Sequence, residues 1–419
     1  MFTSTRRKDC GLDIRTRTLA VTAGVVLALA VGACSAGKPS ASAPPKPAAR
    51  ASTVSSPPSA SPTAAVLRRS RPAPQFRDPL PGMPPVRQGN VYAATAPGRL
   101  RPDVVGDRPY LYVPNSFGAP RTTVIDQRTH KIVRILHTGA LSQHVTPSWD
   151  LRSLYVEASA ANRLVQIDPR TGRVVRRIPQ RRPYNLYFTP DGRQAVVMAE
   201  EDNDIVFADP HRFTRRAVVH DRSCDGPNHA DFSANGRFFL VTCEFSGSLL
   251  KVSTLTHRVL GRLTLPSPSK PQDVRLSPDG RSFYVADMGR DRLLRIPFDR
   301  LRVAGHTDLP SMPHGIYPSR NGKVLYVSDR GAGEVSVVSV RTNRVVDTWT
   351  VPGGHPDMGG VSADGRTLWL SGRYDGYVYG WNTRTGKLVA KIRVGGSPHG
   401  LLVWPQPGRY SLGHTGNLR

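Results

Sequence analysis

The stretch KVLYVSDRGAGEVSVVSVRTNRVVDTW, residues 323–349, contains most of one structural repeat of this chain. Short runs of β-branched and aromatic residues alternate in it with turn-forming residues, which is the pattern of consecutive antiparallel strands. The pair Asn321-Gly322 directly before it is typical of a hairpin turn, because glycine accepts a positive φ and asparagine can hydrogen-bond its own backbone. The stretch therefore predicts three adjacent strands of one antiparallel sheet, entered through a tight turn.

The same turn recurs along most of the chain, each time followed by an apolar strand. Successive turns are separated by 41 to 44 residues. A period in the low forties is the length of one four-stranded propeller blade. The turn positions are Leu151, Gly192, Gly236, Gly280, Gly322, Gly365 and Gly408.

The repeats predict an all-β fold, a seven-bladed β-propeller. The first β-rich segment, residues 110–113, has no inner strand before it, and the last inner strand, residues 400–404, has no outer strands after it. We therefore expect the C-terminal strand to complete the N-terminal blade and close the ring, which leaves no sheet edge unpaired.

Two stretches carry a resemblance to a known group of proteins. Residues 323–349 and RSLYVEASAANRLVQIDPRTGRVVRRI, residues 152–178, resemble the repeats of YVTN propellers, and the match covers residues 91–419. The whole chain resembles YVTN-repeat seven-bladed β-propeller lipoproteins of the actinobacterial type, which are similar in fold to lactonase-like and cytochrome d1-type propellers. The resemblance implies the fold but no single activity, because this architecture hosts lyases, oxidases, lactonases and binding modules.

The N-terminus predicts export and lipidation. Basic residues precede an apolar run, residues 19–33, which is too short to span a bilayer comfortably, so residues 1–33 are predicted to be a signal peptide. The run ends in Val31-Gly32-Ala33-Cys34, which resembles the lipobox of bacterial lipoproteins. The resemblance implies cleavage before Cys34 and a lipid on that residue; the alternatives are an ordinary signal peptide cut nearby and an uncleaved anchor.

Residues 34–90 are rich in proline, alanine and serine and have no periodic apolar face. Such a segment cannot bury enough surface to offset the entropy of ordering, so we expect a disordered tether. The protein is then expected on the extracytoplasmic face of the cell membrane, as a monomer held by its lipid anchor.

The chain carries a net charge of +27. Outside the cell, such a basic protein is expected to meet an anionic envelope polymer or an acidic small molecule. The arginines are spread over every repeat instead of being clustered with aromatic residues, which argues against nucleic acid as a partner.

The polar residue that opens each inner strand is expected to face the central channel. Imidazole and carboxylate are ligands of divalent transition metals, and closing the ring makes His144 and His399 neighbours, with Asp357 on the next blade. We hypothesise that these three residues bind such a metal; the alternative is a polar ring that hydrogen-bonds the backbone and channel water. The seven channel-lining residues are His144, Asn185, His229, Asp273, His314, Asp357 and His399.

Cys224 and Cys243 are the two cysteines left once Cys10 and Cys34 are assigned to the signal peptide and the lipid anchor. Both should lie near one face of a single blade, and outside the cell a disulfide is the default. The alternative is a soft-metal site made by the two thiolates with His229.

Two functions remain open from the sequence. No nucleophile elbow, phosphate-binding loop or metalloprotease helix is visible, which favours a binding or interaction module at the cell envelope. The alternative is a metal-dependent enzyme of the lyase, lactonase or oxidase type that acts in a channel lined by histidine and aspartate.

Overall fold

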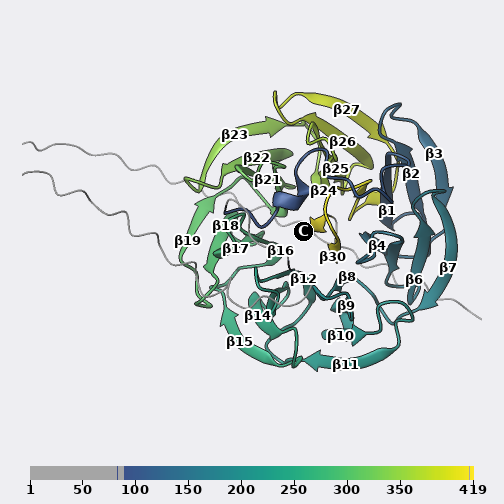
Figure 1. Cartoon of the computed structure of the whole chain (residues 1–419). Coiled ribbons are helices and arrows are strands. Elements are labelled where there is room, and N and C mark those ends of the chain that lie inside the picture. Colours follow the sequence, from purple (N-terminus) through teal and green to yellow (C-terminus); the bar gives the residue numbers. More distant parts are fainter. Residues whose placement is uncertain (1–82, 84–88, 415) are drawn as a thin grey trace, which may run out of the picture. The chain divides into compact units, whose positions relative to one another are not determined.

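The computed structural model describes residues 83, 89–414 and 416–419. The strands of this part form seven antiparallel sheets, the blades, arranged around a central axis (Figure 1). The predicted signal peptide, Cys34 and nearly all of the predicted tether lie outside the described residues. The prediction of a seven-bladed all-β propeller is confirmed.

Blades 2 to 4 take their main strands in chain order from the axis to the rim. Blade 2 contains β4 (Ser142–Pro147), β5 (Leu154–Ala158), β6 (Arg163–Asp168) and β7 (Arg173–Pro179). Blade 3 contains β8 (Asn185–Phe188), β9 (Ala195–Ala199), β10 (Asp204–Ala208) and β11 (Arg215–His220). Blade 4 contains β12 (Pro227–Phe232), β13 (Phe238–Cys243), β14 (Ser248–Ser253) and β15 (Val259–Thr264).

Blades 5 to 7 follow the same order. Blade 5 contains β16 (Pro271–Leu276), β17 (Ser282–Asp287), β18 (Arg292–Pro297) and β19 (Gly305–Asp308). Blade 6 contains β20 (Pro313–Pro318), β21 (Val324–Asp329), β22 (Glu334–Ser339) and β23 (Arg344–Thr350). Blade 7 contains β24 (Pro356–Val361), β25 (Thr367–Gly372), β26 (Tyr377–Asn382) and β27 (Leu388–Arg393).

Blade 1 is built from both ends of the propeller. Its N-terminal strands are β1 (Tyr110–Phe117), β2 (Thr122–Asp126) and β3 (Ile132–Leu136), and β28 (Ser397–Pro398) and β29 (Leu402–Trp404) pair with β1. Leu111 lies opposite Val403 in this antiparallel ladder. The prediction that a C-terminal strand closes the N-terminal blade is therefore confirmed.

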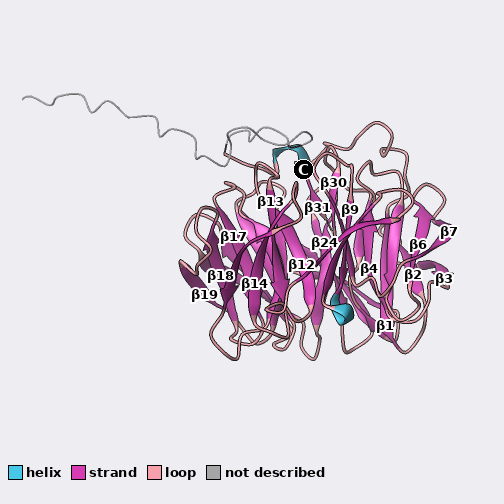
Figure 2. Cartoon of the chain, turned by 90° about the horizontal axis from the view of Figure 1, so that it is seen from below, coloured by secondary structure: helices cyan, strands magenta, loops and turns pink. Residues whose placement is uncertain are grey.

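The core is divided among the interfaces between blades. Seven clusters of buried apolar side chains each join two neighbouring blades. The cluster at the seam contains Leu111 and Val403 of blade 1 with Trp369 of blade 7. Since every blade packs on two neighbours, the ring is stabilised along its whole circumference, and Figure 2 shows the blades standing side by side with loops at both ends of the strands.

The repeat turns follow the conformation that the sequence predicts. The glycines from Gly192 to Gly365 have φ between 67° and 75°, and Leu151 adopts a φ of 62° in the equivalent place, whereas Gly408 at the last turn has a φ of 132°. Burial of the Leu151 side chain between blades 1 and 2 offsets the steric cost of this left-handed conformation.

The last residues differ from the repeat. The turn at Gly408 leads into a small hairpin, β30 (Ser411–Gly413) and β31 (Asn417–Leu418), which attaches to the inner strand of blade 3. Figure 1 shows this C-terminal end at the centre of the ring. Helical structure in the described part is limited to the short 3-10 turns η2 (Ala93–Thr95) and η3 (Glu200–Asp202). None of its helices is long and apolar enough to cross a bilayer.

Candidate metal centre

The inner strands place one polar side chain each at the axis of the ring. In blades 2, 4, 5, 6 and 7 the pairing of the inner strand with its neighbour shifts register at this residue. Such a bulge turns the side chain out of the regular alternation of the strand. The side chains concerned are His144, His229, Asp273, His314 and Asp357.

The hub of the propeller holds five imidazole rings. Four belong to predicted channel residues, and the fifth, His414, follows β30 in the C-terminal hairpin. The ring of His144 lies 4.7 Å from that of His399, 5.0 Å from that of His414 and 5.5 Å from that of His229, centroid to centroid. All of these histidines are at most 2% exposed.

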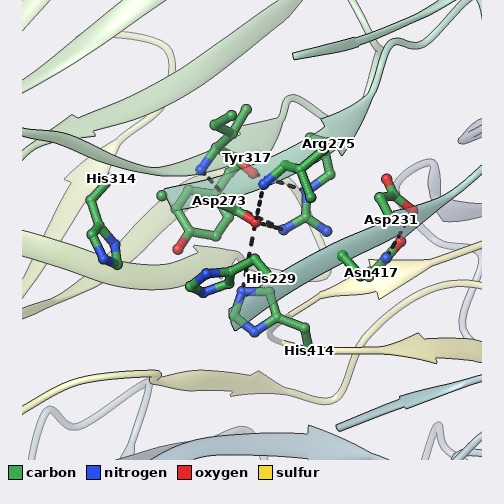
Figure 3. Close-up of polar contacts among 12 residues, drawn as sticks. His229, Asp231, Asp273, Arg275, His314, Tyr317, His414 and Asn417 are labelled. Carbon is green, nitrogen blue, oxygen red and sulfur yellow. Dashed lines mark hydrogen bonds and ion pairs between the residues drawn. The ribbon is translucent and has the colours of Figure 1, made fainter. Parts of the chain in front are cut away.

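Three of the five rings converge on one point. One ligand nitrogen each from His144, His229 and His414 lies within 4.8 Å of the other two. Figure 3 shows His229 and His414 next to each other, one from β12 and one from the hairpin. This set differs from the predicted set of His144, His399 and Asp357, of which His144 alone is retained.

Hydrogen bonds fix the orientation of two of these rings. His144 donates Nδ1–H to the backbone oxygen of Tyr184 at 2.9 Å, so its Nε2 carries the lone pair. His414 Nδ1 lies 3.2 Å from Oδ1 of Asn185, another of the predicted channel residues. An outer hydrogen bond to one ring nitrogen orients the imidazole of a metal-bound histidine in the same way.

Several hub nitrogens have no hydrogen-bond partner among the described residues. These atoms are Nε2 of His144, both ring nitrogens of His229 and Nδ1 of His314, all of them buried. A buried polar atom without a partner costs about 1–3 kcal/mol, so a bound ion or water at these nitrogens would stabilise the fold.

Asp357, one of the predicted metal ligands, is hydrogen-bonded by side chains of the hub. Its Oδ2 accepts a hydrogen bond from Nδ1 of His399 at 2.6 Å. Its Oδ1 accepts hydrogen bonds from Nε and Nη2 of Arg330 at 3.0 and 2.7 Å and lies 3.2 Å from Nδ1 of His314. The carboxylate is thus hydrogen-bonded by the guanidinium of Arg330 and the imidazole of His399, with the imidazole of His314 beside it.

The electrostatics of the hub follow from its burial. Burial lowers the pKa of His144 to about 4, and it also lowers the pKa of His229, His399 and His414. Burial alone would raise the pKa of Asp357, but Arg330 and then His314 hold it below its usual value. Neutral imidazoles, the form that binds metal ions, therefore surround an ionised carboxylate at neutral pH.

Asp273, the remaining predicted channel residue, pairs with a buried arginine. Nη2 of Arg275 donates to Oδ2 of Asp273 at 3.1 Å, and the backbone amide of Ile316 donates to the same oxygen at 2.9 Å (Figure 3). Asp273 Oδ1 lies 3.9 Å from Nε2 of His414. Asp273 therefore ties blade 5 to blade 6 beside the histidine cluster.

The two cysteines lie at one end of blade 4. A disulfide joins Cys224, just before β12, to Cys243, the last residue of β13. The sulfur atoms are bonded to each other, so no thiolate is available to complete a site with His229.

The C-terminal hairpin is the part of the site that the sequence reasoning missed. His414 lies beyond the last repeat turn, so it has no counterpart in the other blades and is outside the spacing that located the channel residues. The signal that could have found it is the departure from the repeat itself, because a tail rich in glycine and polar residues follows the closing strand.

Seven antiparallel blades around a hub of buried polar side chains define a seven-bladed β-propeller. The chain belongs to the YncE-like β-propeller family, whose model matches residues 106–408. It is similar to the uncharacterised protein YncE of Salmonella typhi, with 28% identity over 136 residues. That match covers 32% of this chain and 38% of the Salmonella protein.

Solved structures of the same fold include two of the kinds expected from the sequence. A putative 6-phosphogluconolactonase from Bacteroides uniformis has a TM-score of 0.57 at 17% identity, over 70% of this chain and 99% of that one. The dihydro-heme d1 dehydrogenase NirN has a TM-score of 0.54 at 14% identity, over 74% of this chain and 78% of that one. At these identities the likeness concerns the fold alone.

Proposed function

We propose that this protein is a metal-binding module of the cell envelope, and that its hub binds one transition-metal ion through His144, His229 and His414. The observation that carries the proposal is the convergence of three imidazoles whose ligand nitrogens lie within 4.8 Å of one another. Nε2 of His144 and both nitrogens of His229 have no hydrogen-bond partner among the described residues, and a metal ion would satisfy one nitrogen on each ring.

The chemistry of the three ligands selects the class of ion. Imidazole suits zinc, copper, nickel and iron, whereas calcium and magnesium require oxygen ligands. Three histidines leave a fourth tetrahedral position for water or another ligand, as in the histidine sites of catalytic zinc. The proposed ion is therefore a divalent transition metal, with Zn²⁺ and Cu²⁺ the first to test.

The envelope location is part of the proposal and is supported by the sequence. The apolar run that ends at Cys34 supports a lipid anchor, and the composition of residues 34–90 supports a tether to the propeller. The basic charge supports an anionic envelope polymer or small molecule as a further partner. In this proposal the propeller acts as a monomer on the outer face of the membrane.

Metal content tests the proposed function. The full-length chain, purified and dialysed against Zn²⁺ or Cu²⁺, is expected to retain one equivalent by mass spectrometry of the metal. The variants His144→Ala and His229→Ala are expected to lose it, and the matched control His306→Ala, at an exposed rim position, is expected to retain it. A wild-type chain without stoichiometric metal would overturn the proposal.

A second candidate is a metal-dependent hydrolase at the same hub, favoured by one observation. His399 donates Nδ1–H to Asp357, so its Nε2 carries the lone pair and accepts a hydrogen bond from the hydroxyl of Tyr184 at 3.3 Å, and its ring lies 4.7 Å from the ring of His144. In such an enzyme His399 would accept a proton from water while Asp357 stabilises the imidazolium.

A lactone substrate separates the two candidates, since a fold neighbour is described as a putative 6-phosphogluconolactonase. The hydrolase requires zinc-dependent hydrolysis of 6-phosphogluconolactone that His399→Ala abolishes without loss of bound metal. Bound metal without hydrolysis by the wild-type chain supports the binding module.

A further inference from the structure

The proposed metal ligands are closed off from solvent. His144, His229 and His414 are each 0% exposed. An ion can therefore reach them only if some part of the structure moves. The three ligands differ in how firmly the fold holds them, and this difference identifies the part that moves.

Two of the ligands lie on inner strands of complete blades. β4 and β12 each pair with a neighbouring strand and pack against the blades on either side. Displacing β4 would break blade 2 and its apolar cluster with blade 1, and displacing β12 would break blade 4 and its apolar cluster with blade 3. His144 and His229 are thus positioned by the ring itself.

The third ligand, His414, lies on a much shorter element than the inner strands of the blades. The hairpin of β30 and β31 is joined to the inner strand of blade 3 by a single residue pair, Gly413 with Tyr187. Backbone hydrogen bonds from His414 to Leu186 and from Ser411 to Trp149, at 2.9 and 3.0 Å, add to this attachment. The buried side chains of Leu412 and Leu418 also pack in two of the apolar clusters between blades. Such a short terminal element can open without unfolding a blade.

A buried carboxylate anchors the hairpin in place. Oδ1 of Asp231 accepts hydrogen bonds from Nδ2 of Asn417 and from Nη2 of Arg419, each at 2.9 Å. Asp231 and Arg419 are both 0% exposed, and the guanidinium also lies 4.6 Å above the ring of Tyr92. Asp231 lies on β12, two residues after the ligand His229, so the anchor and the metal centre share one strand (Figure 3).

From this arrangement we infer that the C-terminal hairpin is a closure coupled to the metal, and that Asp231 is its positioning residue. The inference rests on the proposed function. With the hairpin inserted, His414 completes the ligand set and buries the ion; with the hairpin displaced, two ligands remain and the hub opens for exchange.

Coupling of this kind is reciprocal. If hairpin insertion strengthens metal binding by some factor, the metal must stabilise the inserted hairpin by the same factor. Changes to the anchor must therefore alter metal affinity, although the anchor touches no metal ligand atom. A purely structural anchor would lower stability and leave the affinity unchanged.

The first test removes the anchor from the hairpin side. Arg419→Met in the full-length chain is expected to weaken Zn²⁺ binding, measured by isothermal titration, by about 5- to 150-fold, the usual range of such couplings. It should also speed the loss of Zn²⁺ to a chelator, and Arg419→Lys should recover part of both effects.

The matched control for Arg419→Met is Asp287→Asn. Asp287 is another fully buried carboxylate, but it holds Ser269 and Lys270 of a loop in blade 5. This change is expected to leave Zn²⁺ affinity as in the wild type. Equal Zn²⁺ affinity of Arg419→Met and wild type would overturn the coupling.

The second test uses the unaltered chain, so it does not depend on how the variant folds. Hydrogen exchange of the peptide that covers residues 409–419 is expected to slow at least tenfold on adding Zn²⁺, with no such change in His414→Ala. Zn²⁺ bound without slower exchange in this peptide would refute the closure while leaving the proposed function intact. A chain that binds no Zn²⁺ would refute both.

Discussion

At the scale of single residues, His229 is a fully buried histidine that is held by ring contacts instead of hydrogen bonds to its nitrogens. Its ring meets those of His144 and His414 edge to face at 5.5 and 4.8 Å, and neither nitrogen has a hydrogen-bond partner among the described residues. Burial without compensation is expensive for an imidazole. Without metal, His229 is therefore expected to destabilise the fold, and with metal to stabilise it.

Replacing His229 with leucine, a side chain of similar volume, tests this expectation. In the presence of a chelator, His229→Leu should unfold with a free energy within about 1 kcal/mol of the wild type or above it, because the unsatisfied nitrogens are removed. With Zn²⁺ in excess, the wild type should become the more stable protein by mass action. Urea unfolding with and without Zn²⁺ measures both; a large loss of stability in the chelator would show that the ring is needed for packing.

The sequence repeat made it possible to predict which histidines lie on inner strands, but not which side chains they contact. The positions of His144 and His229 follow from the phase of the turns, because they lie equally far before Leu151 and Gly236, whereas His399 lies two residues farther from its turn at Gly408. That Asp357 is engaged by Arg330 could not be inferred, since Arg330 follows β21 of the neighbouring blade and reaches Asp357 only through the loop geometry.

At the scale of elements, the sequence predicts the strands of the blades closely. The exceptions are the strands that follow the last repeat. Five of the seven turns and the strands after them are encoded locally by Asp-Gly or Asn-Gly and β-branched residues. The β30–β31 hairpin has no such code: its three- and two-residue strands are held by contacts to Asp231 and Tyr187 that are remote in sequence. Long-range contacts of this kind cannot be read from a local pattern.

The disulfide of blade 4 allows a prediction for one element. Cys224 and Cys243 are 19 residues apart and close a loop that contains β12, the strand that carries His229 and Asp231. Closing a loop of this size stabilises a fold by about 3 kcal/mol, chiefly by restricting the unfolded chain. The double variant Cys224→Ser/Cys243→Ser should lose about this much in chemical unfolding.

A reducing agent should lower the stability of the wild-type chain toward that of this double variant and leave the variant unchanged. If reduction has no effect on the wild type, the bond does not form in the folded protein.

Closure of the ring determines stability at the scale of the whole molecule. Val403 of β29 is 1% exposed and packs in the cluster that joins blade 1 to blade 7. Val403→Ala should lower the free energy of unfolding by about 2 kcal/mol, through lost burial and the cavity left behind.

The control for the seam is Val346→Ala on the outer strand β23, where the side chain is 59% exposed. This change should fall within about 0.5 kcal/mol of the wild type. Equal effects of the two alanine substitutions in guanidinium unfolding would mean that the seam contributes no more than the rim.

The seam also passes through the metal centre. His144 forms a parallel bridge with Gly400, and a β-carbon at Gly400 would lie 2.1 Å from Cδ2 of the His144 ring. Gly400, next to the strand that closes the ring, therefore positions the first proposed ligand, His144. The last ligand, His414, belongs to residues that are synthesised after all seven blades. A growing chain thus has no complete ligand set until the ring is whole. A metal ion would then bind with full affinity only to a molecule that has finished folding. Incomplete or misassembled chains would bind metal more weakly, without help from a chaperone.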